Sequence, residues 1–186
     1  MFDALDIDPT DLHVDHVAER LDQGWLRSIL PPRSRLSHKG TNGHVLVVGG
    51  GLGMAGAVRL TGEACLRVGT GLVTVVTHPQ NVAAVVMERP ELIVRGVERV
   101  DELQALIARA DVIAIGPGLG QDEWAKSLLD AAIASGKPLV IDADALNLLA
   151  AHPQKCDRWI LTPHPGEAGR LLGVSTRAIQ ADRLGS

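Results

Sequence analysis

The sequence predicts an α/β fold with a mostly parallel sheet and helices on both of its faces. From Lys39 onward, short apolar runs rich in Val, Ile and Leu alternate with longer segments of helical period. The short runs are continuously apolar, which is typical of strands whose two faces are both buried. Glycine-rich turns follow two of them, as at the carboxyl edge of a parallel sheet. This alternation favours right-handed βαβ crossovers.

The same patterns assign the elements in chain order. We expect strands at His44–Val48, Leu72–Thr77, Leu92–Val94, Val112–Ile115, Leu139–Ile141 and Trp159–Leu161. We expect helices at Ala57–Val68, Asn81–Val86, Asp101–Ala108, Glu123–Ser135, Ala145–Ala151 and Glu167–Leu172. No fixed-period repeat interrupts the series, so it is expected to build one domain.

Residues 1–38 differ from the rest of the chain. They combine an acidic start, a short amphipathic segment at Val14–Leu21, a second short helical segment at Trp25–Leu30 and a basic, proline-containing stretch. We predict that residues 1–38 are a linker or lead-in without a core of its own, and that residues 39–186 form the folded domain.

Composition excludes several classes of protein. The 186 residues are 46% apolar and 2% aromatic, enough for one well-cored domain built from aliphatic side chains. The net charge of −4, with acids and bases mixed along the chain, argues against nucleic-acid binding. No apolar run reaches membrane-spanning length, so we expect no membrane partner and a cytoplasmic location. Cys65 and Cys156 lie far apart without metal-ligand spacing, which indicates reduced, structural cysteines.

The first glycine-rich turn, Gly49–Gly56, lies between an expected strand and an expected helix. Its last glycines have the spacing G-x-G-x-x-G, but the next strand ends at Thr77 without the acidic residue that would hold a ribose, which argues against an NAD cofactor. A P-loop is excluded, because G-x-x-x-x-G-K-[ST] does not occur. The small residues Ala55, Gly56 and Ala57 favour a substrate-facing helix start whose free amides suit anions or polar rings. A close-packed turn without a ligand is the alternative.

Further polar and glycine-rich segments are expected at the same sheet edge. Gly116–Gly120 forms a second turn of this type, in which glycine lets a ligand touch the main chain. Asp142, Asp144 and Asn147 follow the next strand. Asp144 is expected to cap the following helix, and Asp142 to face a ligand or metal. The histidines form no recognisable metal-ligand cluster.

His164 is bracketed by two prolines in the segment Thr162–Glu167, directly after the last expected strand. Proline fixes φ and removes a backbone donor, which suits a rigid loop. His164 is therefore expected at the carboxyl mouth of a strand, where ligands bind in open α/β sheets. From the segment alone, an incidental histidine in a sharp turn is an equal alternative.

These motifs together resemble the ADP- or ATP-dependent NAD(P)H-hydrate dehydratase family, whose members have a ribokinase-like fold and repair damaged nicotinamide nucleotides. The residues that carry the resemblance are Ser37-His38-Lys39-Gly40, Gly43, Gly49-Gly50, Gly53-Met54-Ala55-Gly56-Ala57, Arg67-Val68-Gly69-Thr70-Gly71-Leu72-Val73-Thr74-Val75, Gly116-Pro117-Gly118-Leu119-Gly120, Asp142-Ala143-Asp144-Ala145-Leu146-Asn147 and Thr162-Pro163-His164-Pro165-Gly166-Glu167. They cover the chain from Ser37 to about Gly173.

The resemblance implies a three-layer α/β/α domain and a defined reaction. ADP, or ATP in eukaryotic members, phosphorylates the hydroxyl of hydrated NADH or NADPH, and phosphate then leaves as the better leaving group. The implied substrate-binding residues are Ala55, Gly56, Ala57, Gly118 and His164, with Asp142 and Asn147 on the phosphate or Mg²⁺ side. The resemblance also implies a homo-oligomer and, because residues 1–38 look like the connector of bifunctional members, a fused NAD(P)H-hydrate epimerase domain.

One departure from the family bears on catalysis. The family continues after the helix at Glu167 with a K-G-x-x-T loop and a G-x-G-D turn whose aspartate acts as the base, and the chain reaches Ser186 before either. We therefore expect no catalytic residue in this chain, a missing C-terminal part of the domain and little activity from residues 1–186 alone. A small-molecule kinase of the ribokinase superfamily and a non-catalytic scaffold are the rival interpretations.

Overall fold

The computed structural model describes residues 21–30, 32–87, 89–183 and 185. The chain divides into two compact units, residues 1–35 and residues 36–186. In the first unit, α1 (Gln23–Ile29) is capped by Asp22, which accepts a hydrogen bond from the amide of Trp25 at 2.8 Å. None of the α1 residues is buried. The expected amphipathic segment Val14–Leu21 lies outside the described residues, except for Leu21.

The second unit contains a six-stranded, entirely parallel sheet. Its strands are β1 (His44–Val48), β2 (Leu72–Thr77), β3 (Ile93–Gly96), β4 (Val112–Ile115), β5 (Leu139–Ile141) and β6 (Trp159–Leu161). They lie in the order β3-β2-β1-β4-β5-β6. The predicted α/β class is confirmed, and only β3 departs from its expected bounds.

Helices connect the strands. They are α2 (Ala55–Arg67), α3 (Val82–Val86), α4 (Val100–Arg109), α5 (Glu123–Ala134), α6 (Ala143–Ala151), α7 (Pro165–Leu172) and α8 (Thr176–Ala181), with short 3₁₀ turns η2 (Lys39–Thr41) and η3 (Pro79–Asn81). The starts of α2, α6 and α7 were each predicted two residues too late, and α8 was not predicted. Ser175 caps α8 by accepting a hydrogen bond from the amide of Ala178 at 3.2 Å.

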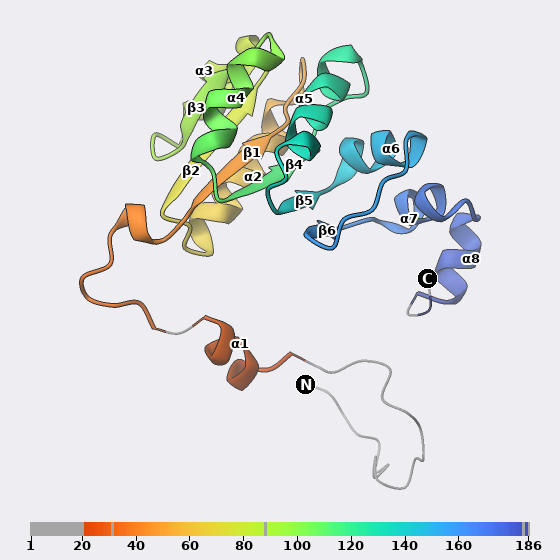
Figure 1. Cartoon of the computed structure of the whole chain (residues 1–186), viewed down its shortest axis with the longest axis horizontal. Helices are drawn as coiled ribbons and strands as arrows, with labels where there is room; N and C mark the ends of the chain where they lie inside the picture. Colours follow the sequence, from red (N-terminus) through yellow and green to blue (C-terminus); the bar gives the residue numbers. More distant parts are fainter. Residues whose placement is uncertain (1–20, 31, 88, 184, 186) are drawn as a thin grey trace, which may run out of the picture. The chain divides into compact units, whose positions relative to one another are not determined.

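The helices form layers on the two faces of the sheet (Figure 1). On one face, Val58 of α2 and Val85 of α3 pack against alternate residues of β1 and β2, such as Val47 and Val75. On the other face, aliphatic residues of α4, α5 and α6 pack against the intervening strand residues, including Leu46, Val48, Ile113, Ile115 and Ile141. The result is the three-layer α/β/α arrangement that the resemblance implied.

The two halves of the sheet are not equally covered. Val47, Ala114, Val140 and Ile160 are direct neighbours across β1, β4, β5 and β6, and they share the face on which α2 packs. Val47 is fully buried, whereas Ile160 on the edge strand is 63% exposed. Continuous burial, expected for every strand, is therefore found in β1 and β2 but not in β6. Among the described residues, no helix is both long enough and apolar enough to cross a membrane.

Candidate functional site

The chain order of the sheet reverses between β1 and β4. From β1 the chain proceeds to β2 and β3 on one side, and it then returns to β4, β5 and β6 on the other. In open α/β sheets, ligands bind outside the carboxyl ends of the strands at such a switch point. The segments that leave β1 and β4 here are the two glycine-rich turns, Gly49–Met54 and Gly116–Gly120. We call them the first and second glycine loops.

The two glycine loops are bound to each other through their backbones. The amide of Gly50 donates to the carbonyl of Pro117 at 3.0 Å, and the amide of Gly51 donates to the carbonyl of Gly118 at 2.7 Å. A Cβ at Gly49 would overlap the Pro117 carbonyl oxygen, so close contact requires glycine there. Because both loops continue strands that are hydrogen-bonded in register, they form one rigid surface at the switch point.

Ala55, Gly56 and Ala57 form the first turn of α2, directly after the first glycine loop. Met54 is the N-cap residue, and no side chain caps this end of the helix. Glycine at position 56 has no explanation within the fold, since its φ is not positive and a Cβ there would meet nothing within 4 Å. A glycine inside a helix costs roughly 1 kcal/mol relative to alanine. A ligand that approaches this turn closely would explain the residue.

Gly118 lies against the same turn. Its φ is +58°, and a Cβ there would come within 2.8 Å of the Met54 Cβ and 3.1 Å of the Ala57 Cβ. The structure therefore brings Gly118 together with the start of α2, although the two segments are far apart in the sequence. Four predicted substrate-binding residues therefore lie close together: Ala55, Gly56 and Ala57 at the start of α2, and Gly118 in the second glycine loop.

The helix cap after β5 is made by Asp142 and not by Asp144. Asp142, which was expected to face a ligand, is the N-cap of α6, and its Oδ1 accepts a hydrogen bond from the amide of Ala143 at 2.8 Å. Asp144, which was expected to cap the helix, accepts a hydrogen bond from the amide of Gly120 at 2.9 Å. The prediction for Asp144 was wrong because α6 begins at Ala143, whose φ of +49° is the only positive non-glycine value among the described residues.

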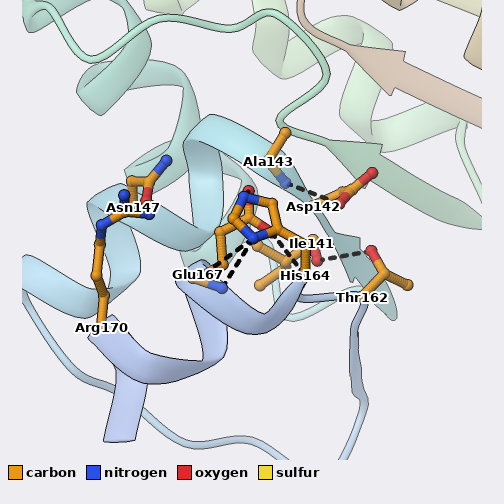
Figure 2. Close-up of polar contacts among 9 residues, drawn as sticks. Ile141, Asp142, Ala143, Asn147, Thr162, His164, Glu167 and Arg170 are labelled. Atoms are coloured by element: carbon orange, nitrogen blue, oxygen red, sulfur yellow. Dashed lines mark hydrogen bonds and ion pairs between the residues drawn. The ribbon is translucent and has the colours of Figure 1, made fainter. Parts of the chain in front are cut away.

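Asn147 lies within α6 and links this helix to α7. Its Oδ1 accepts a hydrogen bond from Nη1 of Arg170 at 2.8 Å, as Figure 2 shows. A carboxamide oxygen that is held by an arginine of the neighbouring helix already has a structural partner. The assignment of Asn147 to the phosphate or Mg²⁺ side stays a prediction.

His164 is the N-cap of α7, just beyond the carboxyl end of β6 (Figure 2). Its Nδ1 accepts hydrogen bonds from the amides of Gly166 and Glu167, at 2.9 and 3.4 Å. The buried carboxylate of Glu167 accepts the amide of His164 at 2.9 Å, which completes a capping box. Since Nδ1 is an acceptor, the neutral ring carries its proton on Nε2, which lies 3.3 Å from Oε1 of Glu167. The ring is 63% exposed, so it remains accessible to a ligand.

Comparison with known proteins identifies the family of the chain. The NAD(P)H-hydrate dehydratase family model matches residues 45–186. The chain belongs to this family. It is 55% identical over 156 residues to the bifunctional NAD(P)H-hydrate repair enzyme of Coxiella burnetii, covering 84% of this chain and 32% of that protein. It is 41% identical over 163 residues to the ADP-dependent (S)-NAD(P)H-hydrate dehydratase of Streptococcus thermophilus, covering 84% of this chain and 58% of that protein.

A solved structure of the family shares the fold. The ADP/ATP-dependent NAD(P)H-hydrate dehydratase of Bacillus subtilis, co-crystallised with ATP and Mg²⁺, aligns with a TM-score of 0.73 and 32% sequence identity. The alignment covers 87% of this chain and 58% of the Bacillus chain. This chain thus spans about a third of the length of the Coxiella repair enzyme and under two thirds of the single-function dehydratases.

The side chains of this family member offer few metal ligands. Within the part of the chain that the structure describes, no group of three His, Cys, Asp or Glu residues could hold a metal ion. Mg²⁺ is commonly held by one or two carboxylates together with substrate phosphates and water. Asp142 fits such a site, because Oδ1 serves the cap and leaves Oδ2 for a ligand.

Two residues that contact the candidate site were not predicted from the sequence. Thr77, at the end of β2, and Asn81, in the turn that follows, both donate hydrogen bonds to the first glycine loop. Their position was a usable signal in the sequence, because Thr77 ends and Asn81 follows β2, a strand that neighbours β1. The sequence does not show which loop their side chains contact.

The hollow lined by Leu129, Ile133, Leu148 and Leu149 lies between α5 and α6. It is on the helical flank and not at the carboxyl ends of the strands. None of the predicted site residues lines it. The glycine loops at the switch point are therefore the better candidate for the substrate site.

Proposed function

We propose that the whole protein dehydrates hydrated NADH or NADPH, with ADP or ATP as the phosphoryl donor. Family membership supports this function, and Gly56 is the observation in the molecule that carries it. An uncapped helix start with an unexplained glycine, beside a second glycine loop, is suited to a ligand that touches the main chain. The family's substrate has both a polar ring and phosphate groups.

In this proposal the chain contributes binding and orientation. The first turn of α2 and Gly118 hold the hydrated ring, and His164 contacts it from the end of β6. The hydroxyl of the hydrate attacks the terminal phosphorus of the nucleotide, and the leaving nucleotide takes the electrons of the broken P–O bond. The ring nitrogen then donates its electron pair, and the C–O bond breaks to release phosphate and leave an iminium ion. The adjacent ring carbon loses a proton to solvent, which restores the double bond and returns the electron pair to the nitrogen.

The family resemblance assigns the role of the base, which accepts the hydroxyl proton, to the aspartate of a G-x-G-D turn. This motif does not occur in the 186 residues. Bound Mg²⁺ would supply charge neutralisation at the phosphates, and we propose that Asp142 would hold it through Oδ2. Asn147 remains a weaker candidate for that side, since Arg170 already engages its oxygen.

The function can be tested with hydrated NADPH and the whole protein. We expect ADP to restore the near-ultraviolet absorbance of the reduced nicotinamide, with one AMP and one phosphate released for each NADPH formed. Hydrate without nucleotide and nucleotide without hydrate are the controls. Phosphoryl transfer to a sugar or vitamin without turnover of the hydrate would favour the kinase interpretation, and no binding of either compound would favour a scaffold.

The remaining expectations are part of the same proposal. We propose a cytoplasmic location, supported by Cys65 and Cys156, which are both free thiols. Burial raises the pKa of the Cys65 thiol, so it is a poor nucleophile. We also propose that residues 1–38 connect the domain to a fused epimerase and that the enzyme is a homo-oligomer. Leu60 and Val68, 68% and 80% exposed on α2, are apolar surface that a second copy would cover.

A further inference from the structure

The carbonyl oxygen of Gly50 accepts hydrogen bonds from three donors. Oγ1 of Thr77 donates at 2.7 Å, Nδ2 of Asn81 at 2.8 Å and the amide of His78 at 3.1 Å. A carbonyl oxygen has two lone pairs and is usually satisfied by one or two donors. All three donors come from the end of β2 and the turn after it. The first glycine loop, which follows β1, is thus hydrogen-bonded to the end of the neighbouring strand β2 and to the turn after it.

Asn81 fastens a second carbonyl as well. Its Nδ2 also lies 2.8 Å from the oxygen of Gly51, and the residue is only 7% exposed. A carboxamide nitrogen carries two hydrogens, so it can donate to both oxygens at once. The two carbonyls belong to consecutive peptide planes. Fixing both leaves the loop between β1 and α2 little freedom to rotate.

The direction of the next amide follows from peptide geometry. In a trans peptide, the carbonyl oxygen and the following N–H point in opposite directions. Because the Gly51 carbonyl points toward Asn81, the amide of Leu52 points away from it. Together with the amide of Met54, which also donates to the Gly51 carbonyl, Asn81 therefore fixes the direction of the Leu52 amide at the exposed tip of the loop. This amide lies just before the uncapped start of α2.

We propose that Asn81 is a positioning residue for the substrate site, with Thr77 as its partner on the shared carbonyl. This inference rests on the proposed function, since it assumes that the glycine loop receives the hydrated nucleotide. Asn81 holds the loop in the binding conformation before substrate arrives. Binding then has no cost for ordering the loop.

Two variants and a matched control test the inference in the whole protein. Asn81→Ala removes both donors. Asn81→Asp keeps the shape but places a carboxylate against two carbonyl oxygens. Gln80→Ala removes an exposed side-chain amide from the adjacent position and serves as the control. The first measurement is hydrogen exchange at the amides of Gly51 and Met54, whose acceptors are Gly118 and Gly51.

We expect both Asn81 variants to raise the exchange rate at these two amides by 10-fold or more, while the amides of α5 exchange at an unchanged rate. In the Gln80→Ala variant, exchange should be unchanged at all of these amides. Protonation of the new carboxyl restores one donor, so lowering the pH should recover part of the protection in Asn81→Asp but not in Asn81→Ala. A role limited to general stability would raise exchange throughout the domain. Such a uniform change, or unchanged loop exchange, overturns the proposal.

The second measurement separates this inference from the proposed function. Titration of hydrated NADPH should give a dissociation constant about 10-fold higher for Asn81→Ala than for the unchanged protein, and KM should rise while kcat changes less than 2-fold. If the unchanged protein binds the hydrate and Asn81→Ala binds it equally well despite a loosened loop, Asn81 does not position this site. If the unchanged protein does not bind the hydrate, the proposed function fails, and the positioning role for its substrate fails with it. The exchange result then reports only how the loop is held.

Discussion

The two ends of the candidate site are built in different ways. At the switch point, the glycine loops are mostly buried apart from the tip at Leu52–Met54. They are hydrogen-bonded to each other and held from both sides, by Asn81 on one and Asp144 on the other. At the other end, His164 follows β6, which is the edge strand of the described sheet. Among the described residues, the hydrogen bonds and the ion pair of its ring all lie within its own helix start. Ile160 and Leu161 of that strand are 63% and 40% exposed.

This difference separates two ways of making a binding site. The glycine loops form a preorganised backbone surface, because long-range contacts over-determine their conformation. The β6–α7 end has fewer buried contacts, which is typical of regions with low local stability. Substitutions in the loops should therefore act through the fold, and substitutions at His164 through a local cap and a ligand contact.

The largest effect is expected at Gly116, where the second glycine loop meets the start of α6. Its φ is +125°, and a Cβ there would overlap the Asp142 carbonyl oxygen. Gly116→Ala should lower the free energy of unfolding by about 3 kcal/mol or more, measured by urea denaturation. Gly120→Ala is the control, because φ is also positive but a Cβ would meet nothing within 4 Å. Equal losses in the two variants would mean that the close approach adds nothing to the strain.

The next largest effect is expected at His164. His164→Ala should raise KM for the hydrate roughly 10-fold, the equivalent of one lost hydrogen bond of about 1.4 kcal/mol, and the lost cap should cost about 1 kcal/mol of stability. His164→Asn separates these effects, since asparagine is a good N-cap residue but lacks the imidazole. It should keep the stability and still show the raised KM. A normal KM in His164→Asn would leave His164 with only its capping role.

Gly56→Ala should have opposite effects on stability and binding. Alanine in the first turn of α2 should raise the free energy of unfolding by about 0.5 to 1 kcal/mol, because glycine has the lower helix propensity and the site has room for a Cβ. The added methyl group should weaken hydrate binding, by about 10-fold if the ligand touches this turn. Denaturation and calorimetric titration measure the two effects. Gain of stability with unchanged binding would place the ligand elsewhere.

The sequence predicts the sheet well because the strand signal is local. The apolar runs of β1, β2, β4, β5 and β6 have the predicted bounds, since turns or polar residues end each run sharply. Helix starts are less predictable, because they depend on caps. α6 begins two residues early because Ala143 adopts a positive φ beside Asp142, and α7 begins early because a histidine serves as its N-cap. Histidine is not among the residues usually preferred there.

The arrangement of the site was only partly predictable. Gly56 and Gly118 could be proposed from glycine spacing and family resemblance, but the resemblance does not show why each position needs glycine. The contacts of Asn81 with Gly50 and of Asp144 with Gly120 join residues 31 and 24 positions apart. Such pairings depend on how the strands are ordered, so no local pattern could predict them.

The smallest effect is expected at Glu63, in the C-terminal half of α2. Hydrogen bonds from Arg59 and Arg89 hold the pKa of its carboxyl below the ordinary glutamate value of about 4.3. A lowered folded-state pKa stabilises the fold above that value, and the contribution is lost as the pH falls through the folded pKa. Glu63→Gln should therefore be slightly less stable than the unchanged protein at pH 7, and this difference in stability should close on acidification.

Asp101, whose pKa is lowered by Arg99, titrates in both proteins, so its contribution cancels from the difference in stability, here called the gap. Glu91 lines one surface hollow together with Glu63 and Arg89, and it is exposed, so Glu91→Gln is the control for removal of a neighbouring carboxylate. Urea midpoints compared across the acid range measure the gap, and one that stays constant with pH would show that Glu63 acts through packing and not through its charge.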